Sequence, residues 1–213
     1  MKKIGIIGSG MVGRALAAGL TKHGYQVMVG SGNKSKREEI NKELGVLTGT
    51  FTKAALFGET VIIAIKGTSA EKVILTLADM LSGKTVIDTT NPISDRSPVN
   101  GVIQYFTSLE ESLMERLQKS APKANLVKAF SCVGNAFMID PEFELKPTMF
   151  ICGNNVSAKK DVTTLLEKVG WEVEDMGKME SARAIEPLCM LWCIPGFLEN
   201  RWNHAFKLLK KTS

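Results

Sequence analysis

The sequence predicts an α/β fold, a doubly wound parallel sheet with a short C-terminal helical extension. Three observations predict it. The chain begins with an apolar strand, a glycine-rich turn and a helix; further apolar runs alternate with helical segments; and these runs are continuously apolar. Continuous apolar strands are typical of a parallel sheet covered on both faces, and right-handed crossovers between them produce the doubly wound arrangement.

The individual elements are expected where the residue pattern changes. The apolar runs predict strands at residues 4–7, 25–29, 45–48, 60–65, 85–88, 125–130, 148–152 and around 171–173. Helical periodicity predicts helices at residues 14–20, 36–44, 69–81, 108–119 and 158–169. From Glu180 onward the pattern is helical, and Pro195-Gly196 is expected to divide it into two pieces. The longest loop, residues 91–105, is expected to border a ligand.

The turn after the first strand predicts a dinucleotide site. It has the sequence Gly8-Ser9-Gly10-Met11-Val12-Gly13 and lies between a strand and a helix, as in a Rossmann fold. Gly8 would form the tight turn, Gly10 would let the backbone approach a pyrophosphate, and Gly13 would allow close helix–strand packing. The phosphates would lie at the helix N-terminus, where free N–H groups favour anions. The alternative is a glycine turn with a structural role alone.

The end of the second strand favours NADP over NAD. NAD sites usually place an Asp or Glu about 20 residues beyond the first glycine, to bind the ribose 2′-hydroxyl. This chain has no carboxylate between the first strand and Glu38, and a 2′-phosphate would instead be held by hydroxyl, amide and cationic groups. The alternative is that the cations only solvate the first turn of a helix. The residues available are Ser31, Asn33, Lys34, Ser35, Lys36 and Arg37.

The carboxyl ends of the other strands predict where the reacting rings would lie. Ligands of doubly wound sheets bind there, at the point where the strand order reverses. Hydride transfer between two flat rings needs alignment more than a proton-transfer residue, and we expect no catalytic side chain. Lys66 would contact the cofactor or lie in solvent, and Asn91 would contact it or form a turn. The segments nominated are Ala64-Ile65-Lys66-Gly67, Thr89-Thr90-Asn91-Pro92 and Ser131-Cys132-Val133-Gly134-Asn135-Ala136.

Composition argues against several other classes of protein. The net charge of +5 is modest and no basic segment has interleaved aromatics, which makes nucleic acid an unexpected partner. The four cysteines form no CxxC pair and only two histidines accompany them, so we expect no metal site. No signal peptide is evident at the first strand, and the apolar stretch 188–198 is too short to span a bilayer, so a cytoplasmic protein is expected.

The C-terminal segment contains many large apolar residues for its length. They would form an intramolecular core or a homodimer interface. We therefore expect residues 1–178 to form an NADP-binding domain, and residues 179–213 to form a helical extension packed on it or on a partner subunit. The residues concerned are Trp192, Ile194, Phe197, Leu198, Trp202 and Phe206.

Several motifs taken together resemble a known family. The chain resembles the coenzyme F420-dependent NADP oxidoreductases, which pass hydride between NADPH and a deazaflavin. It is also similar to the cytoplasmic domain of membrane metalloreductases, where the acceptor is a flavin. The motifs, which extend over nearly the whole chain, are Gly8–Gly13, Gly30-Ser31, Val86–Pro92, Val127–Phe130, Val133–Ala136, Asp140–Phe143, Cys152–Asn154 and Ala182–Leu188.

The resemblance implies a set of cofactor contacts. It implies NADP binding by Ser9–Val12, with Ser31 and Lys36 at the 2′-phosphate. It also implies nicotinamide contact near Ile65 and Asn91-Pro92. The second substrate, coenzyme F420 or a flavin such as FMN or FAD, would lie against Val133–Ala136. Gly32 stands where the family often has an arginine, and Asn33 and Lys34 are expected to substitute for it.

Two other functions use a similar N-terminal half. A pyrroline-carboxylate or β-hydroxyacid type reductase usually builds its substrate site from a large helical domain. About 33 residues follow Glu180 in this sequence, which argues against that class unless a dimer completes the pocket. The other alternative is a non-catalytic NADP-sensing module.

Overall fold

The computed structural model describes residues 2–211, and its largest element is a six-stranded parallel sheet. The strand order is β3-β2-β1-β4-β5-β6. β1 pairs with both β2 and β4, so the order reverses beside β1 and creates the switch point of a doubly wound fold. The predicted fold class is confirmed. The strands are β1 (Lys3–Ile7), β2 (Gln26–Gly30), β3 (Leu47–Gly49), β4 (Thr60–Ile63), β5 (Thr85–Asp88) and β6 (Asn125–Lys128).

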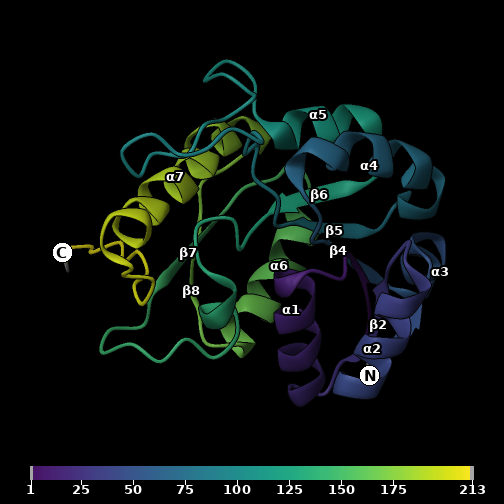
Figure 1. Ribbon diagram of the computed structural model, residues 1–213. Coiled ribbons are helices and arrows are strands. Elements are labelled where there is room, and N and C mark those ends of the chain that lie inside the picture. The colour runs from purple at the N-terminus through teal and green to yellow at the C-terminus, as the bar shows by residue number, and fades with distance from the viewer. Residues whose placement is uncertain (1, 212–213) are drawn as a thin grey trace.

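Helices cover both faces of this sheet, because successive strand residues point to opposite sides. Ile6 is buried with Leu16 of α1 and Val162 of α6, whereas Ile7 is buried with Ile74 of α4 on the other face. Figure 1 shows α4 and α5 side by side over one part of the sheet, with α1 and α6 away from them. The helices are α1 (Met11–Lys22), α2 (Lys34–Leu44), α3 (Phe51–Phe57), α4 (Gly67–Leu81), α5 (Leu113–Ser120) and α6 (Val156–Lys168).

The last two strands form a separate small sheet. β7 (Thr148–Ile151) and β8 (Glu172–Asp175) pair in parallel, and an antiparallel bridge between Lys128 and Cys152 joins this pair to the end of β6. The apolar runs in the sequence predict both strands. They do not predict that the two strands pair with each other or that Cys152 bridges to Lys128, because these contacts join distant segments.

Two helices differ from the sequence prediction. α3 is absent from that prediction; it is seven residues long and begins where the Thr50 side chain accepts a hydrogen bond from the Lys53 N–H. α5 begins at Leu113 and not at residue 108, because Ser112 and Glu115 form a reciprocal capping box that fixes the start of the helix.

The C-terminal prediction of two helical pieces is wrong. α7 (Ala182–Glu199) continues through Pro195 and ends at Asn200, whose backbone is left-handed (φ 53°). Residues 200–211 contain no helix and return to the small sheet, where the Thr148 N–H donates to the Phe206 carbonyl (2.9 Å). Trp192 is buried and Ile194, Trp202 and Phe206 are partly buried, whereas Phe197 and Leu198 are exposed. A domain boundary at residue 178 stays a prediction.

None of the helices within residues 2–211 combines the length and the apolar character that crossing a membrane requires.

Candidate functional site

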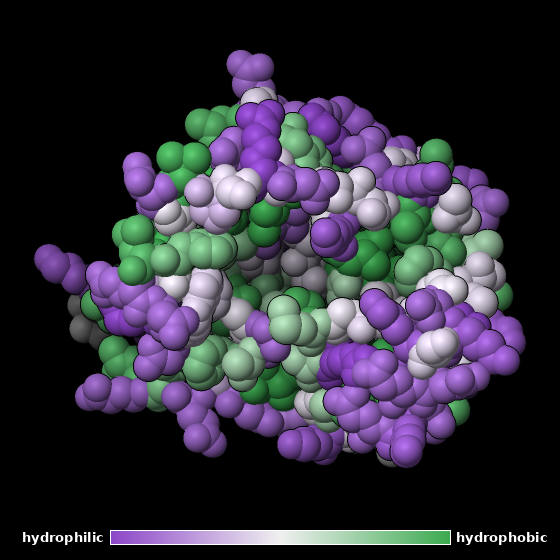
Figure 2. Space-filling model, in the orientation of Figure 1, coloured by the Kyte–Doolittle hydropathy of each residue, from purple (hydrophilic) through white to green (hydrophobic). Residues whose placement is uncertain are grey.

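A cleft of about 530 Å³ lies at the carboxyl ends of β1, β4 and β5, beside the switch point. Its lining includes three of the segments nominated from the sequence, and Figure 2 shows a hollow near the middle of this face of the molecule. The lining residues are Gly10–Val12, Ala64–Thr68, Thr89–Asn91 and Ile93–Asp95.

The three glycines of the opening turn differ in what surrounds them. Gly8 has φ +134°, and a Cβ there would lie 2.0 Å from the Ala64 carbonyl oxygen. A Cβ at Gly13 would lie 2.2 Å from the Gly8 oxygen. No atom of the described structure lies within 4 Å of a Cβ built on Gly10. Gly8 and Gly13 are therefore required by packing, whereas the Gly10 backbone faces open space that a ligand can approach.

The two helices that begin beside the switch point have no side-chain cap. α2, α3, α5 and α6 are each capped by an Asn, Thr or Ser side chain. Gly10 before α1 and Lys66 before α4 supply no such cap. The first-turn N–H groups of α1 are thus available to an anion, and no acidic residue lies in that turn.

Ser31 connects the end of β2 to the glycine turn. It is buried, and its Oγ lies 2.9 Å from the Ser9 Oγ and accepts a weaker bond from the Asn33 N–H (3.3 Å). Arg37 donates to the Ser31 carbonyl oxygen (2.7 Å). The structure therefore brings Ser9 and Ser31 together, and the Arg37 guanidinium holds the backbone at Ser31.

The cations expected at the 2′-phosphate lie on the first turn of α2. The Asn33 Oδ1 caps this helix by accepting from the Lys36 N–H (3.2 Å). The side chains of Lys34 and Lys36 are exposed, and Lys34 lies 3.8 Å from Glu38 in a loose ion pair. They make a positive, solvated rim beside Ser31, without a fixed geometry of their own.

The ends of β4 and β5 approach each other closely. A Cβ on Gly67 would lie 2.1 Å from the Asn91 carbonyl oxygen, so a side chain at 67 would separate the two segments. Lys66 points into solvent and lies 3.8 Å from Asp95, which agrees with the solvent alternative for that residue. Pro92 is buried and is not among the residues that line the cleft, and its carbonyl accepts from the Phe106 N–H (2.9 Å).

Asn91, which lines the cleft, and Ser131, which is hydrogen-bonded to it, each carry an unsatisfied polar atom. The Asn91 Nδ2 donates to the Ser131 carbonyl oxygen (2.7 Å), while the Asn91 Oδ1 and the Ser131 Oγ are buried and make no hydrogen bond in the described structure. Buried polar atoms are normally paired, so these two point to a ligand that completes them. A carboxamide can donate to such an oxygen, which is the chemistry that a nicotinamide offers.

A second cavity, of about 600 Å³, adjoins the first at Met11, which lines both. Its walls come from the short helix η1 (Asn135–Phe137), from α7 and from the returning C-terminal segment. Gly134 packs on Trp192, where a Cβ would lie 2.6 Å from the indole ring. The cavity residues are Met11, Gly134–Phe137, Trp192 and Asn200–Asn203.

Aromatic rings make one wall of this second cavity. Trp192 lies 5.5 Å from Trp202 between ring centroids and is stacked on His204 at 5.0 Å. The sequence nominated Gly134, Asn135 and Ala136, which do line the cavity. It also nominated Val133, which is buried in the core behind them. From the sequence, Trp192 and Trp202 are expected in the core or at an interface. The apolar pattern does not predict that they line a cavity.

The groups next to these cavities do not offer ready proton transfer. Burial raises the pKa of the Cys132 thiol to about 12, which keeps it protonated. His204 is held between Trp192 and the chain, with its Nε2 2.9 Å from the Trp192 carbonyl oxygen. His23 lies at the far end of α1, paired with Asp140. Within residues 2–211 no group of three His, Cys, Asp or Glu side chains is placed to hold a metal ion.

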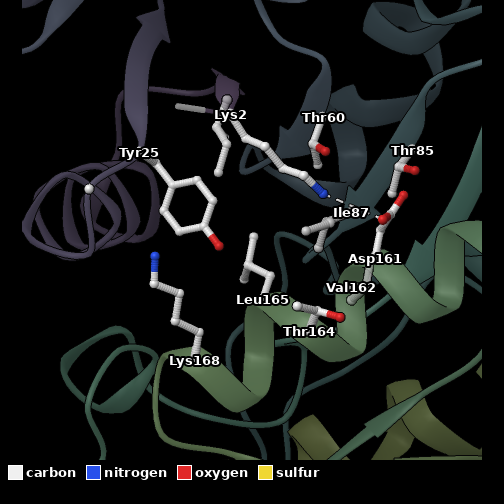
Figure 3. Close-up of a pocket in the computed structure, with 12 residues that line it drawn as sticks. Lys2, Tyr25, Thr60, Thr85, Ile87, Asp161, Val162, Thr164, Leu165 and Lys168 are labelled. Carbon is white, nitrogen blue, oxygen red and sulfur yellow. Dashed lines mark hydrogen bonds and ion pairs between the residues drawn. The ribbon is translucent and has the colours of Figure 1, made fainter.

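A third cavity, of about 330 Å³, lies at the opposite, amino ends of the strands (Figure 3). Tyr25 and the apolar side chain of Leu165 point into it, and its rim cations have partners. Lys2 lies 3.5 Å from Asp161, and the Lys168 ammonium lies 4.7 Å from the centre of the Tyr25 ring. Ligands of doubly wound sheets bind at the carboxyl ends, so the first two cavities and not this one define the candidate site.

The residues present therefore fit NADP, and the fold and cleft define a class: a doubly wound dinucleotide-binding module. Residues 3–92 match the family model described as NADP oxidoreductase coenzyme F420-dependent. The predicted resemblance to this family is confirmed by this match and by the relatives described next.

Three relatives illustrate this similarity. A crystal structure assigned as an F420-dependent NADP-reductase from Arthrobacter sp. FB24 superimposes with a TM-score of 0.90, at 27% identity over 99% of this chain and 100% of that one. The F420-dependent NADP reductase of Methanocaldococcus jannaschii is 29% identical and is covered over 90% of its length by 89% of this chain. Metalloreductase STEAP3 of Rattus norvegicus is 30% identical over 92% of this chain.

The match to the metalloreductases is partial, because the chain spans 39% of the length of STEAP3 and 35% of the length of human STEAP2. A pyrroline-5-carboxylate reductase from Coxiella burnetii superimposes with a TM-score of 0.60 at 19% identity, a likeness of fold alone.

Proposed function

We propose that this protein transfers hydride between NADP(H) and a flat electron carrier, either the deazaflavin coenzyme F420 or a flavin (FMN or FAD). The observation that carries the proposal is the pair of adjoining cavities. One begins at an uncapped helix N-terminus and contains an unpaired amide oxygen, and the other has an aromatic wall. Met11 lines both, so rings bound in the two cavities would meet beside it.

The cofactor would be held along the carboxyl edge of the sheet. The N–H groups of the Gly10–Val12 turn would bind the pyrophosphate, and Ser9, Ser31 and the α2 cations would bind the 2′-phosphate. The nicotinamide would lie between Ile65 and Asn91, with its carboxamide donating to the Asn91 Oδ1. Bound NADPH supplies a hydride, and the protein's part is to align the donor and acceptor carbons.

The acceptor would lie on the Gly134–Ala136 segment and against Trp192. Flat conjugated rings stack favourably on such side chains, and indole rings provide a large contact area. Similarity to the F420-dependent reductases supports a deazaflavin, while similarity to the metalloreductases supports a flavin. A homodimer is proposed as well, since Leu191, Phe197 and Leu198 are exposed apolar residues on α7. A cytoplasmic location is also proposed, because all four cysteines are free thiols.

The test is an acceptor screen with purified protein and NADPH, following NADPH absorbance with F420, FMN and FAD. We expect oxidation of NADPH with at least one carrier and, as an order of magnitude, about tenfold tighter binding of NADPH than of NADH. No turnover with any of them would overturn the proposal. Tight binding without turnover would favour the NADP sensor, and turnover of a cyclic imine or a 3-oxo acid would favour the other reductase class.

A variant that fills the second cavity locates the acceptor. Ala136 is exposed at the cavity, so Ala136→Trp should obstruct the acceptor while leaving the NADP cleft open. Turnover should fall by about tenfold or more with NADPH affinity unchanged. Thr52→Trp, on the exposed side of α3, adds the same ring elsewhere and is the matched control. Equal turnover in the two variants would place the acceptor outside this cavity.

A further inference from the structure

A fully buried charged cluster lies beneath the candidate site. Lys128, the last residue of β6, and Asp88, the last residue of β5, are both 0% exposed, and Glu186 of α7 is 2% exposed. The Lys128 Nζ lies 2.7 Å from the Asp88 Oδ2 and 2.8 Å from the Glu186 Oε1. It also donates to the Thr90 carbonyl oxygen at 2.8 Å. An ammonium has three donors, and all three are used.

The two carboxylates extend this cluster to neighbouring elements. The Asp88 Oδ1 accepts from the Thr90 N–H (2.9 Å) and from the Thr90 hydroxyl (2.7 Å). Glu186 accepts from the N–H groups of Leu113 and Met114, which open α5. The cluster therefore links β5, β6, α5 and α7 to the segment that carries Asn91.

Lys128 stays protonated although it is buried. Burial would lower the pKa of Lys128, but the adjacent Asp88 and Glu186 carboxylates outweigh burial and hold that pKa above its usual value. Buried ion pairs often contribute no more stability than apolar residues of the same shape would. Stability alone therefore gives little reason for three buried charges here, whereas their geometry restrains specific atoms.

The restrained atoms belong to both walls of the site. Thr90 precedes Asn91, which lines the cleft and whose Oδ1 has no hydrogen-bond partner in the described structure. Glu186 lies on the same helix as Trp192, which lines the proposed acceptor cavity. Lys128 bonds to the first wall directly and to the second through Glu186.

We propose that Lys128 is a positioning residue for hydride transfer, which fixes the Asn91 segment relative to the Trp192 wall and so sets the spacing of the two reacting rings. The inference rests on the proposed function, because it assigns one ring to each wall. Hydride transfer requires the two carbons to be about 3–3.5 Å apart, and a displacement of about 1 Å can cost about a hundredfold in rate.

The test compares Lys128→Met with a matched lysine at the other end of the sheet. The Lys84 ammonium donates to the carbonyls of Ala55 (2.6 Å) and Gly58 (2.8 Å), far from the cofactor cleft. Lys84→Met should lower the Tm and leave kcat and the deuterium isotope effect on hydride transfer unchanged. Lys128→Met should lower kcat per bound NADPH by about tenfold or more and raise that isotope effect, because misaligned rings make the hydride step rate-limiting. Merely structural damage would lower the active fraction without changing the isotope effect.

A binding readout separates this inference from the proposed function. Adenosine 2′,5′-bisphosphate lacks the nicotinamide, so its affinity should be unchanged in Lys128→Met, while the affinity for NADPH falls by about three- to fivefold. If the wild type reduces no carrier but this selective loss is seen, the proposed acceptor fails and the role of Lys128 at the Asn91 segment stands.

Glu186→Gln covers the case in which Lys128→Met does not fold. It preserves the side-chain shape and one oxygen acceptor, and it should produce the same changes at smaller size. If the folded variants match Lys84→Met in isotope effect and in the ratio of the two affinities, Lys128 is a core residue only and the proposal is overturned.

Discussion

The two edges of the parallel sheet are built from the same strands but treat their backbone groups differently. At the amino edge, side chains satisfy the backbone: Lys84 donates to the carbonyls at the end of α3, and the Asn125 Nδ2 donates to the Gly83 carbonyl (3.1 Å). At the carboxyl edge, α1 and α4 begin without a side-chain cap, and the Asn91 Oδ1 lacks a partner among the described residues. We therefore expect a ligand at the carboxyl edge, which leaves polar groups unpaired, rather than wherever a cavity is present.

The largest expected effect separates the two kinds of glycine at the carboxyl edge. Gly8→Ala places a Cβ 2.0 Å from the Ala64 oxygen at a positive φ, and it should cost more than about 3 kcal/mol of stability. Gly10→Ala meets no atom within 4 Å and has an ordinary φ of −79°, so its Tm should be unchanged. Its NADPH affinity should nevertheless fall about tenfold, or about 1.4 kcal/mol, because the Cβ enters the space of the pyrophosphate. Thermal unfolding and NADPH titration of both variants check this, and a stable, tight-binding Gly8→Ala would contradict it.

A smaller effect concerns the preference for NADPH. Lys36→Ala removes a cation from the first turn of α2 and should weaken NADPH binding by about fivefold at low salt while NADH binding is unchanged. The loss should diminish as salt is added, because the side chain is exposed. Lys123→Ala, an exposed lysine at the amino edge, is the control and should change neither affinity. Equal weakening of NADPH and NADH by Lys36→Ala would mean that the 2′-phosphate lies elsewhere.

A pH effect tests α5, a helix whose start is closed by side chains. Arg183 hydrogen-bonds Glu115 of the capping box, and this lowers the pKa of the Glu115 carboxyl to about 2. A folded-state pKa below the unfolded value adds stability above the unfolded value, near pH 4.5, and that stability is lost as the pH falls toward 2. Arg183→Met should therefore have a lower Tm than the wild type at pH 7, and the difference should shrink below pH 4.5. A difference that is constant from about pH 7 to about pH 3 would exclude this ion pair as its source.

The smallest effect is expected at the amino edge. Thr85 lines the cavity of Figure 3, and Thr85→Val keeps its shape and its β-branch. Stability should stay within about 0.5 kcal/mol of the wild type, and NADPH affinity and turnover should not change. A loss of NADPH affinity in this variant would contradict the expectation that only the carboxyl edge binds the nucleotide.

The sequence predicts the parts of this molecule that depend on local patterns. The glycine turn, the uncharged end of β2 and the strand–helix alternation are each contained in a short segment, so the fold class and the position of the candidate cleft follow from them. Lys128 shows the limit: its cluster joins positions 88, 128 and 186, and only folding brings them together. A signal was nevertheless present, because a lysine at the end of an apolar strand needs a buried partner and Asp88 ends another such strand.

The C-terminal segment shows a second limit. Helical periodicity does not indicate that residues 200–211 leave the helix, because their pairing depends on the distant Thr148. The aromatic residues stand out by their number, yet which of them line a cavity is decided by that pairing.

Because the C-terminal segment returns to β7, the two cavities are lined by different parts of the chain. The turn and the strand ends that would bind NADP all lie within the first 92 residues, whereas the aromatic wall comes from η1, α7 and residues 200–203. Under the proposed function, changes near the end of the chain would alter which carrier is accepted without altering the binding of the nucleotide. A single nucleotide-binding sheet would in this way serve different electron carriers.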